Sequence, residues 1–134
     1  MKLWIDDLRV TPDGYELTAR TYDEAVALLD KHWYDITHIS FDHDLGLASV
    51  DENGEEMSGY DVANYIEEKI VMENFTINHW IGVQTHTSNT PGRDRIYAAI
   101  SYLKERNNLR FKIYNRSYES MTNFDSFGCV LNKK

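Results

Sequence analysis

Short apolar runs separated by longer amphipathic segments dominate the hydrophobic pattern of the chain. Five runs have strand length, at residues 2–5, 15–20, 36–41, 80–85 and 111–114. Three segments between them carry apolar residues at helical spacing, at residues 21–32, 58–70 and 90–103. Strands that alternate with helices predict an α/β fold with a mostly parallel central sheet of about five strands, covered by helices on both faces.

Two of the predicted helices begin at recognisable capping residues. Thr21 followed three residues later by Glu24 has the pattern of a capping box. For the third helix we expect Thr90 as the N-cap and Pro91 as the first helical residue. These signals place the helix starts directly after polar loops.

Ionisable side chains follow three of the predicted strands directly. Asp6 and Asp7 follow the first strand, the sequence Asp-His-Asp at 42–44 follows the central one, and His86 follows the next. A single acidic strand end is most often a solvated loop. Three such ends meet at one edge of a parallel sheet, where open α/β folds bind ligands. Their convergence therefore favours a functional site at that edge.

The composition and net charge of the sequence exclude several classes of protein. A chain of 134 residues with 42% hydrophobic and 27% charged residues suits one globular domain over 1–134, in which the tail 117–134 shows no clear pattern. The net charge of −8 opposes extended DNA binding. The absence of a long apolar run predicts no membrane association, and a single cysteine, Cys129, fits the cytoplasm. The sequence makes no prediction of the oligomeric state.

Five short motifs resemble one family of proteins. They are IDDLR at 5–9, ART at 19–21, SFDHDLG at 40–46, SGYDV at 58–62 and HTSNTPGR at 86–93. In this order they resemble the cyclic-phosphate processing receiver-like family, related to the receiver domains of two-component signalling. The resemblance runs from about residue 3 to residue 96. It implies a flavodoxin-like sheet and a role in hydrolysing or sensing cyclic phosphates, on RNA ends or in cyclic nucleotides.

The sequence also departs from an ordinary receiver domain in two places. The segment 111–116 lacks the Lys-Pro pair that completes a receiver phosphorylation site, and a loop at 9–14 replaces the first helix. Both departures argue against a phosphorelay. Two carboxylates are candidates for the receiver phosphoacceptor position: Asp42 lies at the strand end, whereas Asp44 has the matching Asp-Leu-Gly-Leu context.

The residue types at the strand ends suit the cleavage of a cyclic phosphodiester. Such cleavage needs an activated water, charge stabilisation and a proton for the leaving hydroxyl. We expect Mg²⁺ or Mn²⁺ to be held by hard carboxylate oxygens, from Asp6, Asp7, Asp42 and Asp44. The expected catalytic residues are His43, His86 and Asp42, since histidines exchange protons near neutral pH. A metal-free mechanism, with the two histidines transferring every proton, is the alternative.

Four further residues are candidates for contacts with phosphate: Arg9, Ser88, Asn89 and Arg93. Arg93 lies in the first turn of a predicted helix, whose N-terminal amides also favour anions. The structural alternative for Arg93 is an ion pair on its own helix. For His43 it is a hydrogen bond that only orients its two neighbouring aspartates.

Three functions are compatible with this sequence. We expect a hydrolase of cyclic phosphates, acting on a small cyclic-phosphate or nucleotide ligand or on an RNA end. A module that binds a cyclic nucleotide without turnover is the second possibility, and a receiver-type phosphoacceptor domain is the third.

Overall fold

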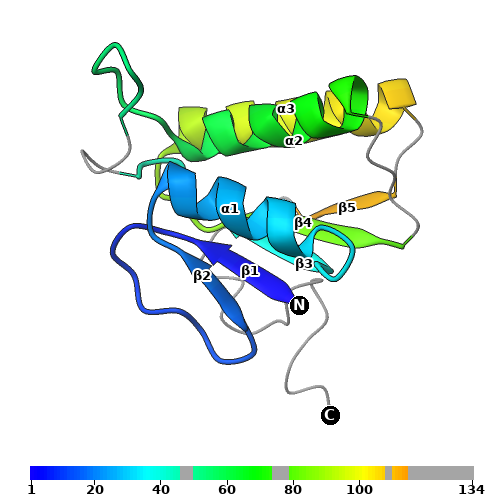
Figure 1. Cartoon of the computed structure of the whole chain (residues 1–134), viewed down its shortest axis with the longest axis horizontal. Helices are drawn as coiled ribbons and strands as arrows, with labels where there is room; N and C mark the ends of the chain where they lie inside the picture. Colours follow the sequence, from blue (N-terminus) through cyan, green and yellow to red (C-terminus); the bar gives the residue numbers. More distant parts are fainter. Residues whose placement is uncertain (46–49, 74–78, 108–109, 115–134) are drawn as a thin grey trace.

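The computed structural model of the chain describes residues 1–45, 50–73, 79–107 and 110–114. Its elements, in chain order, are β1 Lys2–Ile5, β2 Leu17–Ala19, α1 Tyr22–His32, β3 His38–Phe41, α2 Gly59–Met72, β4 Ile81–Thr85, α3 Thr90–Asn107 and β5 Phe111–Tyr114. The strands form one sheet in the order β2-β1-β3-β4-β5, and every neighbouring pair is parallel. The predicted α/β, receiver-like fold with five parallel strands is therefore confirmed (Figure 1).

The strand order places a switch point between β1 and β3. The chain moves from β1 outward to β2, and then crosses to the other side of β1 to continue with β3, β4 and β5. In flavodoxin-like sheets the crevice outside this point is the usual ligand site. The residues that directly follow β1 and β3 are Asp6 and Asp42.

The hydrophobic core lies between the sheet and the helices. Leu3 and Ile39 are paired in register, as are Ile5 and Phe41, and all four side chains are fully buried. The helices contribute Ala25, Leu29, Val62, Ile66, Ile96 and Ile100 to the same core. Side chains alternate between the two faces of a strand, so Trp4, Ser40 and Gln84, which pair across β1, β3 and β4, occupy the other face.

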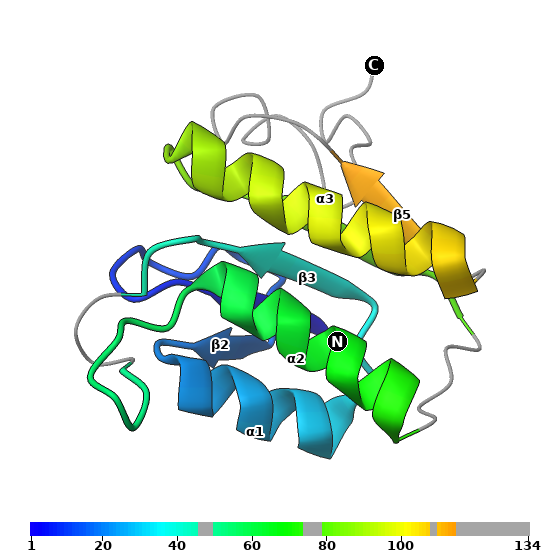
Figure 2. The same ribbon diagram turned by 90° about the horizontal axis from the view of Figure 1, so that it is seen from above.

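All three helices lie side by side on one face of the sheet (Figures 1 and 2). In the described ranges no helix covers the opposite face, so the expectation of helices on both faces is not met there. The physical reason is the connection from β1 to β2, which is a loop, as its sequence predicts, and delivers no helix to that face. Tyr15 of this loop packs edge-on against Trp4, at a centroid distance of 5.3 Å, and accepts a hydrogen bond from Gln84.

The helix starts follow local capping chemistry with two differences from expectation. Thr21 caps α1, accepting a hydrogen bond from the amide of Glu24, but the Glu24 carboxylate accepts from the amide of Arg20 rather than that of Thr21, so the predicted capping box is incomplete. Ser58 and Asp61 form a complete capping box at α2. At α3 the cap is Asn89 rather than Thr90, because the Asn89 side chain accepts from the amide of Gly92 at 3.0 Å and its carbonyl accepts the next amide. Because the side-chain oxygen of Asn89 accepts from the amide of Gly92, Thr90 is the first helical residue, one position earlier than predicted.

No helix within the described parts of the chain has the length and apolar character to span a membrane. Gly46 of the Asp-Leu-Gly motif and the tail 117–134 lie outside the described residues.

Candidate functional site

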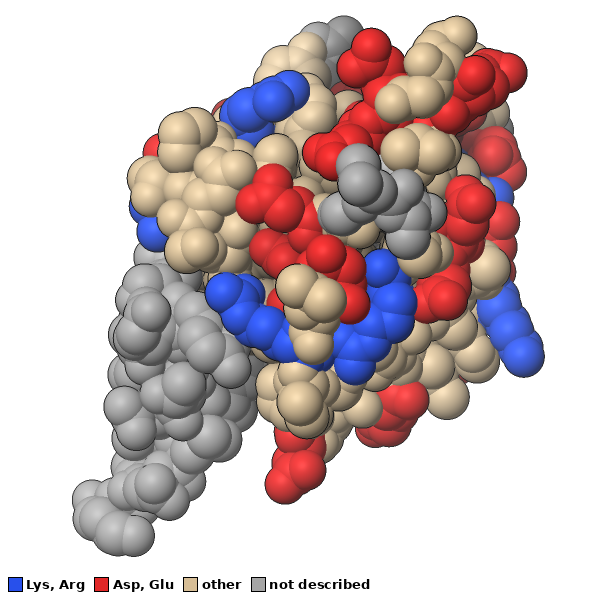
Figure 3. Space-filling view, turned by 90° about the vertical axis from the view of Figure 1, so that its left-hand side faces the viewer, with Lys and Arg blue, Asp and Glu red and all other residues tan. Residues whose placement is uncertain are grey.

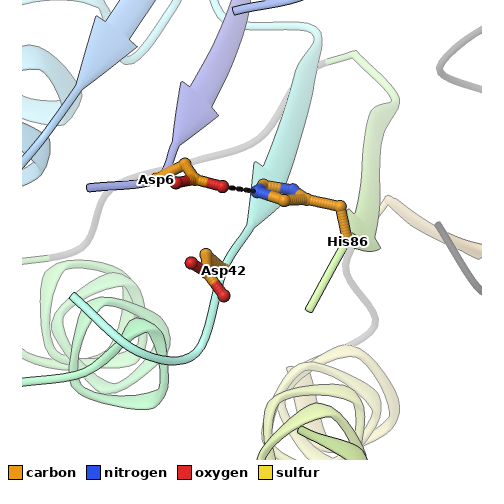
Figure 4. Close-up of side chains that lie close together, drawn as sticks. All are labelled: Asp6, Asp42 and His86. Atoms are coloured by element: carbon orange, nitrogen blue, oxygen red, sulfur yellow. Dashed lines mark hydrogen bonds and ion pairs between the residues drawn. The ribbon is translucent and has the colours of Figure 1, made fainter. Parts of the chain in front are cut away.

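The three polar strand ends converge at the switch point. Asp6, Asp42 and His86 each place one potential ligand atom within 4.8 Å of the others. The three residues directly follow the neighbouring strands β1, β3 and β4, and Asp6 and His86 point toward each other with Asp42 beside them (Figure 4). All three are buried, with exposures of 1%, 9% and 0%. Ionisable groups this deep require partners or a ligand.

Main-chain hydrogen bonds to the neighbouring strand fix each of the three residues. The amide of Asp6 donates to Ala19 at the end of β2, that of Asp42 to Ile5, and that of His86 to Phe41. The parallel ladders thus continue one residue past each strand. The backbone of the site is consequently part of the rigid sheet.

Asp6 is held as a carboxylate. Burial alone would raise its pKa, but hydrogen bonds from His86 and from the amides of Arg9 and Leu8 lower the pKa to about 2. Both amides donate to Oδ1 at 2.8 Å, and His86 binds Oδ2 at 2.8 Å. Accepted hydrogen bonds of this kind stabilise the charged form.

His86 is fixed on all sides. Its Nε2 lies 2.8 Å from Asp6, its Nδ1 lies 2.8 Å from the hydroxyl of Ser40, and its ring stacks on Trp4 at 3.7 Å with an interplanar angle of 8°. Burial lowers its pKa, although the bond to Asp6 acts in the opposite direction. A neutral ring bonded to a carboxylate carries its proton on Nε2, so the Ser40 hydroxyl donates to Nδ1. Both ring nitrogens are therefore engaged within the protein.

Of the three residues, Asp42 is the one whose charged form is destabilised by its surroundings. Burial, and after it the negative charge of Asp6, raises the pKa of Asp42 to about 6. The charge of Asp7 adds to this effect, whereas a hydrogen bond with the Thr87 side chain and the charge of Arg9 oppose it. The site thus holds more negative charge than it can neutralise, and it favours a proton or a cation beside Asp42.

This excess negative charge fits a divalent cation. Asp6 and Asp42 offer hard oxygen atoms, which suit Mg²⁺ or Mn²⁺, and the nearby charge of Asp7 adds to the attraction. Asp44 lies apart from this cluster, since its side chain is 68% exposed and bonds to His43. Of the two candidate phosphoacceptor positions, the structure therefore places Asp42 beside Asp6. Asp and Glu side chains gather across this end of the molecule, with Lys and Arg among them (Figure 3).

Two arginines support the loop that follows β1. Arg9 donates to the carbonyl of His86 at 2.7 Å and lies 3.6 Å from Oδ2 of Asp6. Arg20 donates from the same nitrogen to the carbonyls of Asp6 and Arg9, at 3.1 and 2.6 Å. Arg9 remains 39% exposed, so it can contact a ligand at the rim. Arg20 acts on the site only through the loop.

We expect the substitution Arg20→Lys to lower the free energy of unfolding by about 1–2 kcal/mol, because the single ammonium nitrogen cannot donate to both carbonyls and also keep the 3.5 Å contact of the second guanidinium nitrogen with the hydroxyl of Thr11. Urea unfolding at neutral pH measures this loss. Unchanged stability would show that the loop holds its position without Arg20.

His43 lies at the edge of the cluster rather than in it. Its Nδ1 is 3.1 Å from Asp44 and 3.3 Å from the side-chain nitrogen of Asn89, while Nε2 is buried and has no hydrogen-bond partner within the described parts of the chain. Its ring rests against Gly92, where any side chain would overlap it. His43 thus presents one unengaged nitrogen, which His86 does not.

The remaining predicted phosphate contacts lie in the β4–α3 segment. Ser88 is exposed. The side-chain oxygen of Asn89 caps α3, and its side-chain nitrogen lies near Nδ1 of His43. The Arg93 guanidinium lies 3.5 Å from Asp94, the neighbouring residue on its helix. The structure therefore brings Asp6, Asp42, His86 and Arg9 together. Asn89 approaches this group only through His43, and no hydrogen bond or ion pair joins Ser88 or Arg93 to it among the described residues.

Close backbone approach at Gly59 also supports the site. A Cβ atom at this position would overlap the carbonyl oxygen of Asp42.

We expect Gly59→Ala to destabilise the protein by about 1–3 kcal/mol and to displace Asp42, although helix propensity alone predicts the opposite sign. Thermal unfolding measures the effect, with Asn64→Ala in the same helix as the control. Equal stability of Gly59→Ala and the wild type would contradict the close approach.

Sequence reasoning missed four contributors to the site: Trp4, Ser40, Thr87 and Arg20. Trp4 occupies an alternating position in a strand, and nothing in the pattern distinguishes it from an ordinary buried residue. Ser40 opens the SFDHDLG motif at 40–46, which carried the family resemblance. Arg20 belongs to a motif that carried the family resemblance, and this was the available signal for it. Thr87 follows His86 directly and was visible as part of a polar strand end.

Comparison with known proteins agrees with this geometry. None of the curated proteins and none of the solved structures compared with the chain matches it. Residues 1–102 match the family model described as the cyclic-phosphate processing Receiver domain. This match covers more than half of the 134 residues and every strand end that builds the site. The chain belongs to the family of cyclic-phosphate processing receiver domains.

Proposed function

We propose that this protein hydrolyses cyclic phosphodiesters at the switch point of its sheet. The observation that carries the proposal is the convergence of Asp6, Asp42 and His86 from three strand ends, in a chain of this family. A structural core has no need of two carboxylates in mutual repulsion, so their burial points to a bound cation and an anionic ligand. The proposal also keeps the cytoplasmic location expected from the single cysteine.

The reaction requires water to attack phosphorus while the bond to one ring oxygen breaks. The released oxygen takes up a proton, and the product is a phosphate monoester with a free hydroxyl. Asp6 and Asp42 would hold Mg²⁺ or Mn²⁺, which supplies charge for the phosphate oxygens and lowers the pKa of a coordinated water. The exposed part of Arg9 would bind one of the remaining oxygens.

The two histidines have different roles in this proposal. His43 would exchange protons with water or the leaving oxygen through Nε2, which has no hydrogen-bond partner among the described residues. Because this nitrogen is buried, such exchange requires the His43 ring to move toward the ligand. His86 would act as a positioning residue that holds Asp6, because both of its nitrogens are engaged. Direct proton transfer by His86 requires it first to release Asp6.

A second candidate is a module that binds a cyclic nucleotide without turnover. The engagement of both His86 nitrogens favours it, since one of the two predicted proton donors is already committed to the fold. The receiver-type alternative draws on the place of Asp42 at the end of β3, but the residues after Tyr114 are Asn-Arg rather than Lys-Pro.

A divalent cation should stabilise the protein. At ten times its dissociation constant, Mg²⁺ adds about 1.4 kcal/mol to the free energy of unfolding if it binds only the folded state. Urea unfolding with Mg²⁺ and with chelator measures this difference in the wild type and in Asp42→Asn. We expect the stabilisation only in the wild type, and equal stabilisation of the two would place the cation elsewhere.

A chromatographic screen tests the hydrolase directly. The protein is incubated with 2′,3′-cyclic mononucleotides, 3′,5′-cyclic mononucleotides, cyclic dinucleotides and an RNA ending in a cyclic phosphate, with Mg²⁺, Mn²⁺ or chelator. The proposal predicts conversion of at least one substrate and at least about 10²-fold slower conversion by His43→Ala. No conversion under any condition, with ligand recovered intact after tight binding, would favour the binding module.

A further inference from the structure

A pocket whose lining includes His43, but not Asp6, Asp42 or His86, has no role in the reaction as described. It has a volume of about 310 Å³ and is lined by residues 43–45, residues 56–58, the start of α2, and Arg95 of α3. This volume lies at the lower end of the range for small-molecule sites. Because His43 lines the pocket and directly follows Asp42, a ligand here would adjoin the Asp6–Asp42 cluster.

One wall of the pocket is a stacked pair of side chains. The guanidinium carbon of Arg95 lies 4.2 Å from the ring centroid of Tyr60. Stacking on an aromatic ring holds the planar guanidinium in one orientation, so its donors keep a fixed direction. Leu45 and Met57 add apolar surface to the lining.

The lining also contains the carboxylates of Glu56 and Asp44. Glu56 ends a short turn in which Asp51 accepts hydrogen bonds from the amides of Asn53 and Glu55, and it bridges back to Val50. Asp44 also belongs to the lining and bonds to His43. Ionised carboxylates only accept hydrogen bonds, so these residues favour a ligand edge made of donors.

Guanine is the nucleobase whose edges match both kinds of charged group in the lining. Its N1–H and exocyclic amino group are adjacent donors, whereas adenine, cytosine and uracil each place an acceptor beside their donor on that edge. Its O6 and N7 are the pair of acceptors that arginine binds in two-point contacts. A lining that contains both an arginine and carboxylates is therefore complementary to guanine and disfavours the acceptor edges of the other bases.

We propose that this pocket binds the guanine base of the nucleotide whose cyclic phosphate lies at the Asp6–Asp42 cluster, with Glu56 and Arg95 as the residues that determine specificity. The inference rests on the proposed function for its place in the reaction. Base recognition itself requires no turnover, so binding and hydrolysis can be tested separately.

The test compares guanosine and adenosine forms of the same ligands. Calorimetry measures the binding of GMP and AMP, and chromatography measures turnover of the corresponding 2′,3′-cyclic and 3′,5′-cyclic nucleotides. The variants are Glu56→Gln and Arg95→Ala. The matched control is Glu52→Gln, an exposed residue of the same turn that is outside the pocket lining.

We expect the wild type and Glu52→Gln to favour guanine by about ten- to one-hundred-fold, and each pocket variant to lose most of that preference while its affinity for AMP is unchanged. A preference for GMP without turnover of any cyclic nucleotide would support the base pocket and refute the hydrolase. Turnover without base preference, a preference that survives both substitutions, or failure to bind either mononucleotide would overturn the base pocket.

Discussion

Replacing Asp42 by asparagine should make the protein more stable at neutral pH and at the same time inactive. Burial and the charge of Asp6 raise the pKa of this carboxyl to about 6 from an ordinary value of 3.8. Above pH 6 the native protein carries the charged form at a cost of about 3 kcal/mol, which the neutral amide avoids. If the folded protein becomes more stable when the charge of Asp42 is removed, the charge is not there for stability, and we infer that it serves the function of the site.

The difference in stability between Asp42→Asn and the wild type should depend on pH. A carboxyl with a raised native pKa takes up its proton in the folded state first, so the wild type regains stability as the pH falls from about 6 toward 3.8. The advantage of Asp42→Asn should thus be full above pH 6 and absent below pH 4. Urea unfolding across this range in chelator measures both curves. An asparagine variant less stable than the wild type at pH 7.5 would contradict the proposed repulsion.

Replacing His86 by alanine should produce the opposite effect on stability. The substitution leaves the buried Asp6 carboxylate without its 2.8 Å partner and removes the ring stacked on Trp4. Removing one member of a buried pair costs about 3–5 kcal/mol, so we expect a loss of this size in urea unfolding at pH 7. Turnover should also fall, because Asp6 loses its orientation.

Two comparison variants separate positioning from direct catalysis. His32→Ala, at the end of α1, is the matched control and should change stability little. Ser40→Ala removes only the partner of Nδ1 and should cost about 1–3 kcal/mol, because the buried acceptor is left unsatisfied. If His86→Ala abolished turnover but unfolded like the wild type, His86 would be a proton-transfer residue rather than a positioning one.

The fold was predictable because each strand has a short apolar run and a polar end. Residues 38–41 are buried on both faces, and the run that predicts this strand stops at Asp42, where the ladder stops. The loop in place of a first helix was visible from its Pro-Asp-Gly turn. The one-sided layer of described helices was not predicted, because the alternation of elements fixes neither face on its own.

The sequence predicted which residues make up the site, but not which hydrogen bonds they form with one another. Asp6, Asp42 and His86 were expected together because parallel strand ends share an edge. Sequence spacing carries no information on which nitrogen of His86 meets Asp6, nor that Ser40 occupies the other. The separation of Asp44 from the cluster was likewise invisible, because a change of direction after Asp42 depends on the contact of Gly59 with the Asp42 backbone.

The most direct test of the central claim is the fate of solvent oxygen. The wild type is incubated in ¹⁸O-labelled water with a 2′,3′-cyclic nucleotide, a 3′,5′-cyclic nucleotide and a cyclic-phosphate RNA end, and the products are analysed by mass spectrometry. Attack of water on phosphorus predicts one labelled oxygen in each phosphate monoester formed, and no such product with Asp42→Asn. Full recovery of unlabelled cyclic ligand from the wild type, or equal labelled product from Asp42→Asn, would contradict hydrolysis at this site.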